Sequence, residues 1–309
     1  MPASNNPKTE NVKMDRKVRL KKDLKEKQEQ VNIILDRYLP RKDEYPKNTH
    51  KALRYSVFAG GKRLRPYLTM CAYQMYQENV EQITPVAAAI EMLHTFSLIH
   101  DDMPDIDNDE YRRGKKSCHA LFGEGEALLA GDALLISAFE LITYAEIKAE
   151  HRVQFVRELA EQCGVKGLIA GQMVDLESEG KKVDKKTIDY IHKNKTAKLI
   201  QLCLRFGAVA GGAPKDELAA IEDFGAKIGL AFQIVDDLLD IEGDPDEMGK
   251  TVGKDAHVHK ATYPSVYGLA ESKRRAQELI SEAKAAIAPL GEKALMLDIL
   301  ADYLLTRKS

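Results

Sequence analysis

The sequence predicts an all-α fold, and three observations support this fold class. Apolar residues recur with a helical period in four long segments, VAAAIEMLHTFSLIH, ALLAGDALLISAFELITYAEI, AKLIQLCLRFGAVAGG and FGAKIGLAFQIVDDLLDI. The sequence has no alternating apolar and polar run long enough for a useful β-strand. The breaks between helical segments are rich in glycine, proline or charge, and none has the composition of a flexible interdomain linker. We therefore predict a single domain over residues 15–309.

The elements follow in order along the chain. Residues 1–14 are predicted to be disordered, and a charged amphipathic helix then runs toward Tyr38. Helix breaks are predicted at 40–46, near Pro85, across ESEGKKVDKK, at GGAP and across EGDPDEMGKTVGKDAHVHK. The chain shows no repeat of fixed period, although aspartate clusters end two of the apolar helices.

The composition limits the classes of function. The 309 residues include 46 basic and 48 acidic side chains, and this balance excludes a general attraction to nucleic acid or to an anionic membrane. The N-terminal segment lacks the apolar stretch of a signal peptide, and no run reaches the roughly 18 apolar residues of a membrane span. The four cysteines show no zinc-ligand spacing and are predicted to be reduced thiols of a cytoplasmic protein: Cys71, Cys118, Cys163 and Cys203.

The first aspartate cluster lies in SLIHDDMPDIDNDEYRRGKKSCH, directly after an apolar helix. Crowded carboxylates repel one another and are costly to desolvate, so a cation has to compensate them. Pro104 disfavours a continuous helix through the cluster. We therefore expect a helix from Val86 to carry Asp101 and Asp102 in its last turn, and a loop to bring back Asp107.

The second aspartate cluster, QIVDDLLDI, is predicted to lie within a helix. Asp236 and Asp240 are one turn apart, and with Gln233 and Asp237 they form a polar stripe. The alternative is an ordinary solvated face, but the nearby basic residues lie mostly in glycine-containing loops rather than at pairing positions. Carboxylate oxygens suit Mg²⁺, which usually binds one or two carboxylates together with substrate phosphates. Two such clusters indicate a polyphosphate held between them.

A basic segment, AGGKRLRP, is a candidate second phosphate site. Its flexible backbone lies beside Lys62, Arg63 and Arg65. A cluster of this kind is more often a solvated turn, and the Walker pattern is missing. His94 is about two helical turns before Asp101 and could face the same cavity, although a lone histidine on a helix is more often a core residue.

Six motifs together resemble the short-chain trans-isoprenyl diphosphate synthases, closest to the bacterial-type farnesyl diphosphate synthases: GGKRLRP, HTFSLIHDDMPDIDNDEYRRG, LAGDALL, GQMVDL, KTAKLI and FQIVDDLLDIEGDPDEMGKTVGKD. They occur in order from about Tyr38 to the C-terminus. The resemblance implies an all-helical homodimer with a deep central cavity, isopentenyl and allylic diphosphate substrates, and Mg²⁺. It implies three ions with substrate bound, and Mn²⁺ as a substitute.

The same resemblance implies roles for individual residues. Asp101 and Asp107 would be Mg²⁺ ligands with Asp102 in support, Asp105 is an extra acid that also satisfies D-D-x-x-D, and Asp236 and Asp240 would serve a further ion. The isopentenyl diphosphate would be held by Gly61, Lys62, Arg65, His94 and Arg113. The allylic diphosphate would be held by Arg112, Lys195, Lys250 and Lys260, with Thr196 and Gln233 near the reacting carbons and Lys254 and Gln172 as further lining residues.

The implied reaction joins isopentenyl diphosphate to dimethylallyl or geranyl diphosphate by ionisation, condensation and proton loss. Phe96 and Ser97, five and four residues before the first aspartate, would control product length; the aromatic Phe96 favours C15, with C20 as the alternative. Helix geometry leaves open that Phe96 is ordinary core, because Ser97 is nearer the face of Asp101. A terpene cyclase would carry N-D-x-x-S-x-x-x-E where this chain has D-D-L-L-D, and a non-enzymatic ion-binding scaffold would not need the basic residues.

Overall fold

The computed structural model describes residues 7–242 and 261–306, and this part of the chain is almost entirely helical. The α-helices are α1 (Pro7–Tyr38), α2 (Lys47–Val57), α3 (Leu64–Gln74), α4 (Thr84–Asp101), α5 (Cys118–Phe122), α6 (Glu124–Thr143), α7 (Ala149–Cys163), α8 (Leu168–Ser178), α9 (Lys185–Ile191), α10 (Lys198–Gly211), α11 (Lys215–Glu242), α14 (Tyr263–Tyr267), α15 (Leu269–Ile287) and α16 (Leu295–Thr306). The 3₁₀-helices are η1 (Val80–Gln82) and η3 (Ala288–Ala294), and η2 (His192–Ala197) is a π-helix. The all-α prediction is confirmed.

Two short strands, β1 (Tyr111–Arg112) and β2 (Lys115–Lys116), pair antiparallel as a small hairpin. Gly114 lies between them with φ +73°, which a glycine adopts without strain. The hairpin lies on the RRGKK segment, directly after the first aspartate cluster. It therefore carries the two arginines, Arg112 and Arg113, that follow this cluster.

The N-terminal helix starts earlier than the sequence predicts. Because α1 begins at Pro7, residues 7–14 of the segment expected to be disordered are helical. The physical reason is composition, since residues 8–38 contain no glycine or proline and many straight-chain residues with high helix propensity. The predicted break at 40–46 does separate α1 from α2, and ESEGKKVDKK and GGAP lie where α8 and α10 end.

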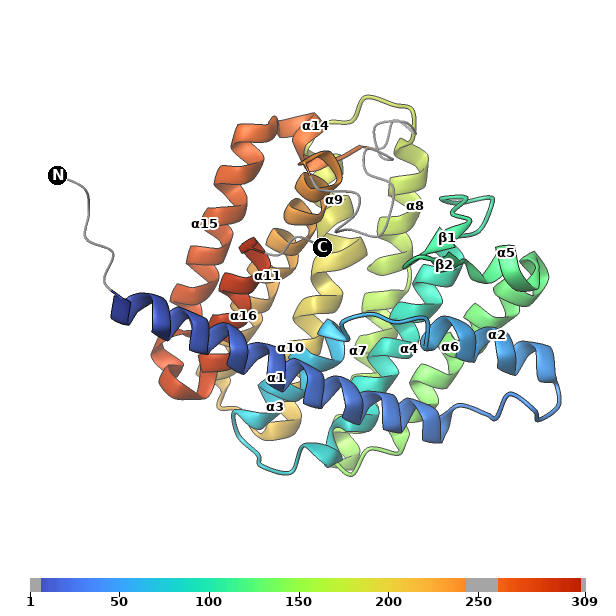
Figure 1. Cartoon of the computed structure of the whole chain (residues 1–309), viewed down its shortest axis with the longest axis horizontal. Helices are drawn as coiled ribbons and strands as arrows, with labels where there is room; N and C mark the ends of the chain where they lie inside the picture. The colour runs from blue at the N-terminus through green and yellow to red at the C-terminus, as the bar shows by residue number, and fades with distance from the viewer. Residues whose placement is uncertain (1–6, 243–260, 307–309) are drawn as a thin grey trace.

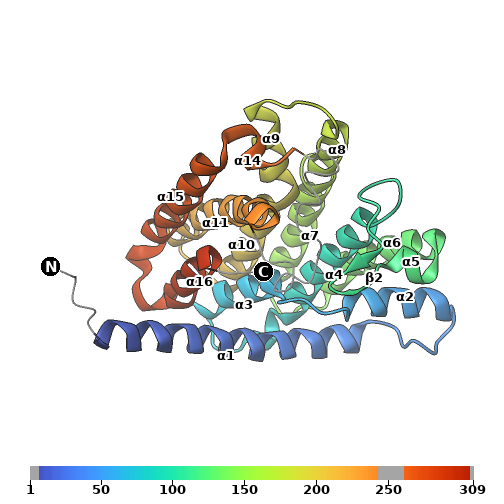
Figure 2. The same cartoon turned by 45° about the horizontal axis from the view of Figure 1, so that its top comes forward.

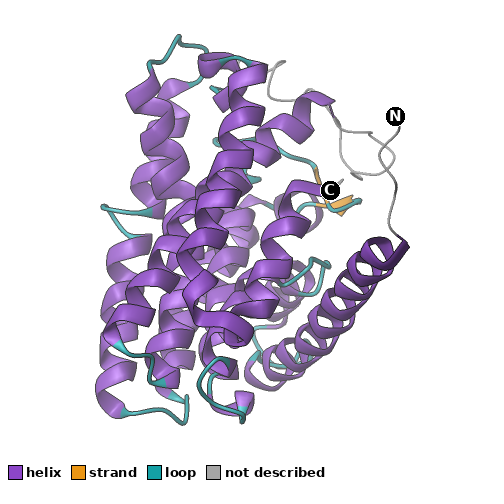
Figure 3. Cartoon of the chain, turned by 90° about the vertical axis from the view of Figure 1, so that its left-hand side faces the viewer, coloured by secondary structure: helices purple, strands orange, loops and turns teal. Residues whose placement is uncertain are grey.

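The helices form a bundle, with α4, α6, α7, α8, α10, α11 and α15 running roughly side by side (Figure 1). Helix α1 lies across one side of this bundle, along the bottom of Figure 2 and at the lower right of Figure 3. Helix α4 packs against α3 and α6 and is buried on all sides along most of its length, from Thr84 to Leu93. A helix that is apolar on all sides packs in the centre of a fold. The C-terminal end of α4 therefore places Asp101 and Asp102 at the edge of the core.

Two glycines seat the π-helix η2 between its neighbours. A Cβ on Gly171 of α8 would lie 2.5 Å from the backbone nitrogen of Lys195, and one on Gly229 of α11 would lie 2.6 Å from the Cα of Ala197. No side chain fits at either position, so α8 and α11 approach the backbone of η2 directly. This close packing fixes the turn that carries Lys195 and Thr196, and π-turns are frequent at functional sites.

Candidate active site

The end of α4 and the loop after it are arranged as the sequence predicts. The helix ends at Asp101, and the backbone nitrogen of Asp107 donates to the carbonyl of Asp101 at 2.8 Å. The nitrogen of Asp109 donates to the carbonyl of Asp102 at 3.0 Å. The loop therefore turns back over the helix end, and it brings Asp107 beside the carbonyls that the helix leaves unpaired.

Asp102 differs from Asp101, because it is buried and bound by Arg112 of the hairpin. The Nε of Arg112 donates to both carboxylate oxygens, at 2.8 and 3.1 Å, and its Nη2 donates to Oδ1. Burial disfavours the guanidinium charge, but the hydrogen bond with Asp102 and the negative charges of Asp102, Asp101 and Asp107 together outweigh this and raise the pKa of Arg112. The pair joins the hairpin to α4. Asp102 therefore has a protein partner, and the Nε and Nη2 edge of the Arg112 guanidinium is occupied by it.

The second aspartate cluster lines a pocket of about 210 Å³ at one side of α11. Its lining residues are Asp175, Ile191, His192, Lys195, Gln233, Asp236, Asp237, Asp240, Ala261 and Thr262. The structure thus brings together Lys195, Gln233, Asp236 and Asp240, which the sequence placed in one site from motifs about 40 residues apart.

Three titratable residues of this pocket were missed as site residues. Asp175 accepts a 2.7 Å hydrogen bond from the Nζ of Lys195, and GQMVDL carries it three residues after Gln172. The sequence pattern did not indicate His192 as a site residue, because helical periodicity does not reveal the π-helix on which it lies. Asp237 was expected on the polar stripe of α11, where it does contact Gln233, but nothing in the sequence indicated that its carboxylate also meets His192 and the backbone nitrogen of Tyr263 in α14.

Thr196 and Gln233, expected near the reacting carbons, are in direct contact. The hydroxyl of Thr196 donates to Oε1 of Gln233 at 2.8 Å, and Nε2 of Gln233 donates to Asp237 at 3.0 Å. The π-helix and α11 are therefore joined by side chains at the pocket.

A second group of site residues surrounds His94 on α4. Nη1 of Arg65 lies 3.3 Å from Nε2 of His94, while Nε of Arg65 has no hydrogen-bond partner. Burial, followed by the positive charges of Arg65, Arg113 and Arg112, holds the pKa of His94 well below its usual range, so the ring is neutral. Burial also lowers the pKa of Arg65, against the favourable fields of Cys203, Glu91 and Asp236.

Gly61 and Arg113 form part of the same group. A Cβ on Gly61 would lie 2.6 Å from the guanidinium of Arg113, and Gly61 has φ +118°. Arg113 also donates to the carbonyl of Gly60. The glycine backbone thus leaves room for a guanidinium that no larger residue would allow. Lys62 lies nearby in sequence, with its ammonium 5.9 Å from the ring of Tyr303.

Arg63 does not serve the phosphate site that its sequence neighbours indicated. It is 4% exposed and donates to Glu91 at 2.7 Å, to the carbonyl of Val57 at 2.6 Å and to Asn32 at 3.1 Å. Its guanidinium is thus satisfied by the protein, and the expectation that Arg63 grips phosphate is wrong. The cause is its left-handed backbone (φ +52°) at the start of α3, which turns it away from Arg65.

The proposed length-control residues lie in the last turns of α4. Phe96 is 5% exposed and meets the ring of His100 edge-on at 4.7 Å. The hydroxyl of Ser97 donates to the carbonyl of His94 at 2.9 Å. The side-chain oxygen of Gln172 is buried without a hydrogen-bond partner. Lys250, Lys254 and Lys260 lie outside the described residues.

The carboxylates fit Mg²⁺ by the chemistry of their donors. Asp101 ends α4 and Asp107 lies in the loop after it, while Asp236 and Asp240 lie one turn apart on α11, so every candidate ligand atom is an oxygen. Within residues 7–242 and 261–306, no group of three or more His, Cys, Asp or Glu side chains could hold a metal ion alone. Mg²⁺ usually takes one or two protein carboxylates and completes its shell with phosphate and water.

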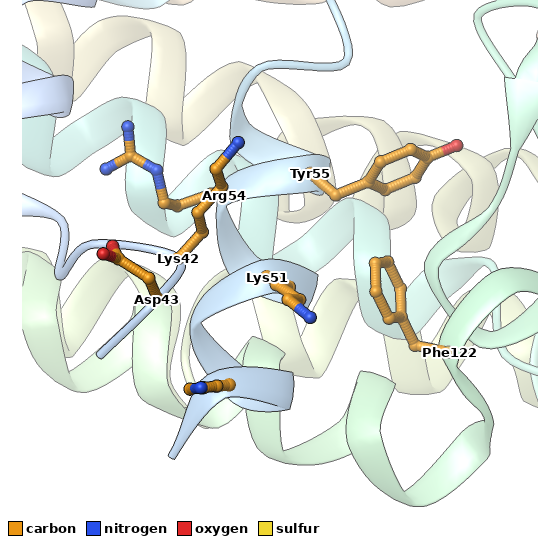
Figure 4. Close-up of a pocket in the computed structure, with 7 residues that line it drawn as sticks. Lys42, Asp43, Lys51, Arg54, Tyr55 and Phe122 are labelled. Atoms are coloured by element: carbon orange, nitrogen blue, oxygen red, sulfur yellow. The ribbon is translucent and has the colours of Figure 1, made fainter. Parts of the chain in front are cut away.

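A separate basic depression of about 570 Å³ lies on the outer side of α2 (Figure 4). It is lined by Lys42, Asp43, Lys47, Lys51, Arg54, Tyr55 and Phe122. The rings of Tyr55 and Phe122 pack edge-on at 5.5 Å, and the hydroxyl of Tyr55 donates to the carbonyl of Lys116 at 2.8 Å. Tyr55, packed against Phe122, therefore supports the hairpin that carries Arg112 and Arg113.

The chain is similar to known proteins along most of its length. Residues 46–295 match the model of the polyprenyl synthetase family. A dimethylallyltranstransferase of Fischerella ambigua is 44% identical over 92% of this chain and 82% of its own, and a geranylgeranyl diphosphate synthase of Cyanophora paradoxa is 41% identical over 93% and 96%. A farnesyl diphosphate synthase of Geobacillus stearothermophilus is 45% identical over 82% and 86%. The apo crystal structure of an FPP/GFPP synthase from Zymomonas mobilis superimposes with a TM-score of 0.83 at 34% identity, covering 93% of this chain and 99% of that one.

Proposed function

Since the chain belongs to the polyprenyl synthetase family of prenyltransferases, we propose that it is a farnesyl diphosphate synthase. It condenses isopentenyl diphosphate with dimethylallyl and then geranyl diphosphate. The observation that carries the substrate assignment is Arg65, a half-buried residue whose Nε is itself buried and has no hydrogen-bond partner beside a neutral histidine. An arginine removed from water in this way needs an anion, and a diphosphate oxygen supplies one.

The two substrates are proposed to occupy separate cradles. Gly61, Lys62, Arg65, His94 and Arg113 hold the isopentenyl diphosphate. Arg112, Lys195, Lys250 and Lys260 hold the allylic diphosphate, with Lys195 oriented by its 2.7 Å hydrogen bond to Asp175. Charge-assisted hydrogen bonds of this kind are roughly twice as strong as neutral ones, so they place the two reacting carbons against each other.

The aspartates Asp101, Asp107, Asp236 and Asp240 would hold Mg²⁺, with Asp102 in support through Arg112. We propose three ions when substrate is present, and Mn²⁺ as a substitute. When bound, Mg²⁺ neutralises the diphosphate leaving group. Thr196 and Gln233 then present oxygen dipoles to the positive charge that develops on the allylic carbon. The proton lost in forming the trans alkene passes to the released diphosphate.

Product length is proposed to be C15, limited by Phe96. The ring is buried one and a half turns before Asp101 on α4, so it blocks a tail that grows along the helix. Relatives of similar identity are named for both farnesyl and geranylgeranyl products, and C20 is the second candidate.

We propose that the enzyme is a cytoplasmic homodimer. Helix α6 exposes Leu128, Leu129 and Ile136, the last 67% exposed, and an apolar row of this kind favours burial against a second copy. All four cysteines are buried and free, in keeping with a reducing compartment. None of the helices in the described part of the chain is long and apolar enough to cross a membrane.

One assay tests the proposal. The purified protein is incubated with isopentenyl diphosphate, dimethylallyl or geranyl diphosphate and Mg²⁺, and the dephosphorylated products are separated by chromatography. Farnesol should dominate, and chelation by EDTA should abolish its formation. A cyclic hydrocarbon without incorporation of isopentenyl carbon would indicate a terpene cyclase, and absence of diphosphate release would indicate a binding scaffold.

A further inference from the structure

Asp237 follows the proposed metal ligand Asp236 and lines the same pocket, but its carboxylate oxygens are bonded by the protein. It is 6% exposed. Its Oδ1 accepts a 3.0 Å hydrogen bond from Nε2 of Gln233, and its Oδ2 accepts one of 2.7 Å from the backbone nitrogen of Tyr263. Nε2 of His192 lies 3.1 Å from the same Oδ2. Both oxygens are therefore engaged by donors from three elements, α11, α14 and η2.

These donors fix the direction of the Gln233 amide. A carboxylate only accepts hydrogen bonds, so the amide must turn its NH₂ group to Asp237 and its oxygen away. That oxygen accepts the hydroxyl proton of Thr196 at 2.8 Å. Because the proton is committed to Gln233, the oxygen of Thr196 has only lone pairs left for other neighbours. The chain of hydrogen bonds thus has one polarity from Asp237 to Thr196, and each link strengthens the next.

We propose that Asp237 is a positioning residue that sets this polarity, so that Gln233 and Thr196 present negative oxygen dipoles to the carbocation. The inference rests on the proposed function, because it needs positive charge to develop at this pocket. Gln233 lines the pocket together with Lys195 and Asp236. If the amide were reversed, its NH₂ would face Thr196, whose own proton would then turn outward toward the cationic carbon.

The alternative is that Asp237 serves only to anchor neighbouring helices. Asp237 accepts a hydrogen bond from the backbone nitrogen of Tyr263, the first residue of α14. The ring of His192 stacks on that of Tyr263, with 5.6 Å between the ring centroids. An anchor of this type would stabilise the fold equally well whichever way the Gln233 amide pointed. The experiment must therefore separate an effect that passes through Gln233 from one that passes through Tyr263 or His192.

Asp237→Asn makes this separation. The asparagine oxygen is drawn to the two donors of Tyr263 and His192, so its NH₂ faces Gln233 and forces that amide to reverse. We expect kcat to fall about ten- to a hundredfold, less than the roughly 100- to 1,000-fold loss when one electrostatic stabilising group is removed outright. KM for both diphosphates should stay within about twofold, since no phosphate contact is removed. Asp189→Asn, which alters an exposed carboxylate bonded to Tyr267, is the matched control and should leave kcat unchanged.

A double-mutant cycle decides the path of the effect. In a Gln233→Leu background, Asp237→Asn should cost less than about threefold in kcat, because the group it acts through is gone. The same loss in both backgrounds, or no loss in the native background, overturns the proposal. Full turnover in Gln233→Leu itself also overturns it, while product formation by the unaltered enzyme still tests the proposed function separately.

The exchanged pair Asp237→Asn with Gln233→Glu keeps one amide and one carboxylate in the buried cluster, and it covers the case in which Asp237→Asn fails to fold. The introduced asparagine would then donate to the introduced glutamate, and that glutamate would accept from Thr196, which restores the original polarity. Circular dichroism checks the helices. We expect the folded pair to reach a kcat within about tenfold of the unaltered enzyme, and a larger deficit contradicts the proposal.

Discussion

Replacing Phe96 with alanine should lengthen the product from mainly C15 toward C20. Phe96 is 5% exposed, and its ring meets His100 edge-on at 4.7 Å. It lies five residues before Asp101, so the substitution removes a ring below the first aspartate cluster and leaves the carboxylates in place. Ionisation should therefore persist, while the tail gains room for another five-carbon unit.

The stability cost of Phe96→Ala sets the conditions of the test. Truncation of a buried phenylalanine costs about 3–5 kcal/mol, of which the edge-on ring contact with His100 accounts for roughly 0.5–1.5. A cost of this size is a large share of the stability of an ordinary domain, so the assay must run well below the melting temperature of the variant.

Phe155→Ala is the matched control for this loss of packing. Phe155 is fully buried on α7 and stacks on Phe206 at 4.1 Å, outside the residues of the candidate site. Its truncation should cost about as much stability but leave the product unchanged. Products are compared by chromatography after dephosphorylation, under excess isopentenyl diphosphate. The reasoning fails if an active, folded Phe96→Ala still stops at C15, if the control lengthens the product equally, or if the unaltered enzyme already makes mainly C20.

The other predictions concern the charges and the hairpin. Asp101→Asn or Asp236→Asn should each cost about 100-fold or more in kcat, because each removes a ligand that neutralises the leaving group; near-normal turnover in both, with helical circular dichroism retained, contradicts the metal assignment. Arg113→Ala should raise chiefly the KM for isopentenyl diphosphate and Lys195→Ala that for the allylic substrate, by about ten- to a hundredfold, and equal effects on both substrates would refute separate cradles. Tyr55→Phe removes one hydrogen bond to the hairpin, of about 0.5–1.5 kcal/mol, and should raise KM about two- to tenfold without changing product length; unchanged kinetics would show that the hairpin needs no such support.

The sequence by itself determined the helical class and the place of the aspartates along it. Helical periodicity is a short-range signal, so the segment from Val86 was predicted to end near Asp101 and does end there. The helix break at Pro104 and the loop that brings back Asp107 were likewise predicted from the local sequence. The helical start at Pro7 was missed, because a charged segment without apolar periodicity gives a weak helix signal.

Only the tertiary structure decided which of two similar neighbours belongs to the site. Arg63 is satisfied by Glu91, whereas Arg65 lies beside His94 with its Nε unbonded. Asp236 and Asp237 both line the pocket, but the carboxylate of Asp237 is taken up by donors from α11, η2 and α14. One step along a helix turns a side chain by about 100°, so residues of identical chemistry face different surroundings. Whether a side chain finds a hydrogen-bond partner depends on helices that are distant in sequence, and local periodicity does not predict how those helices pack.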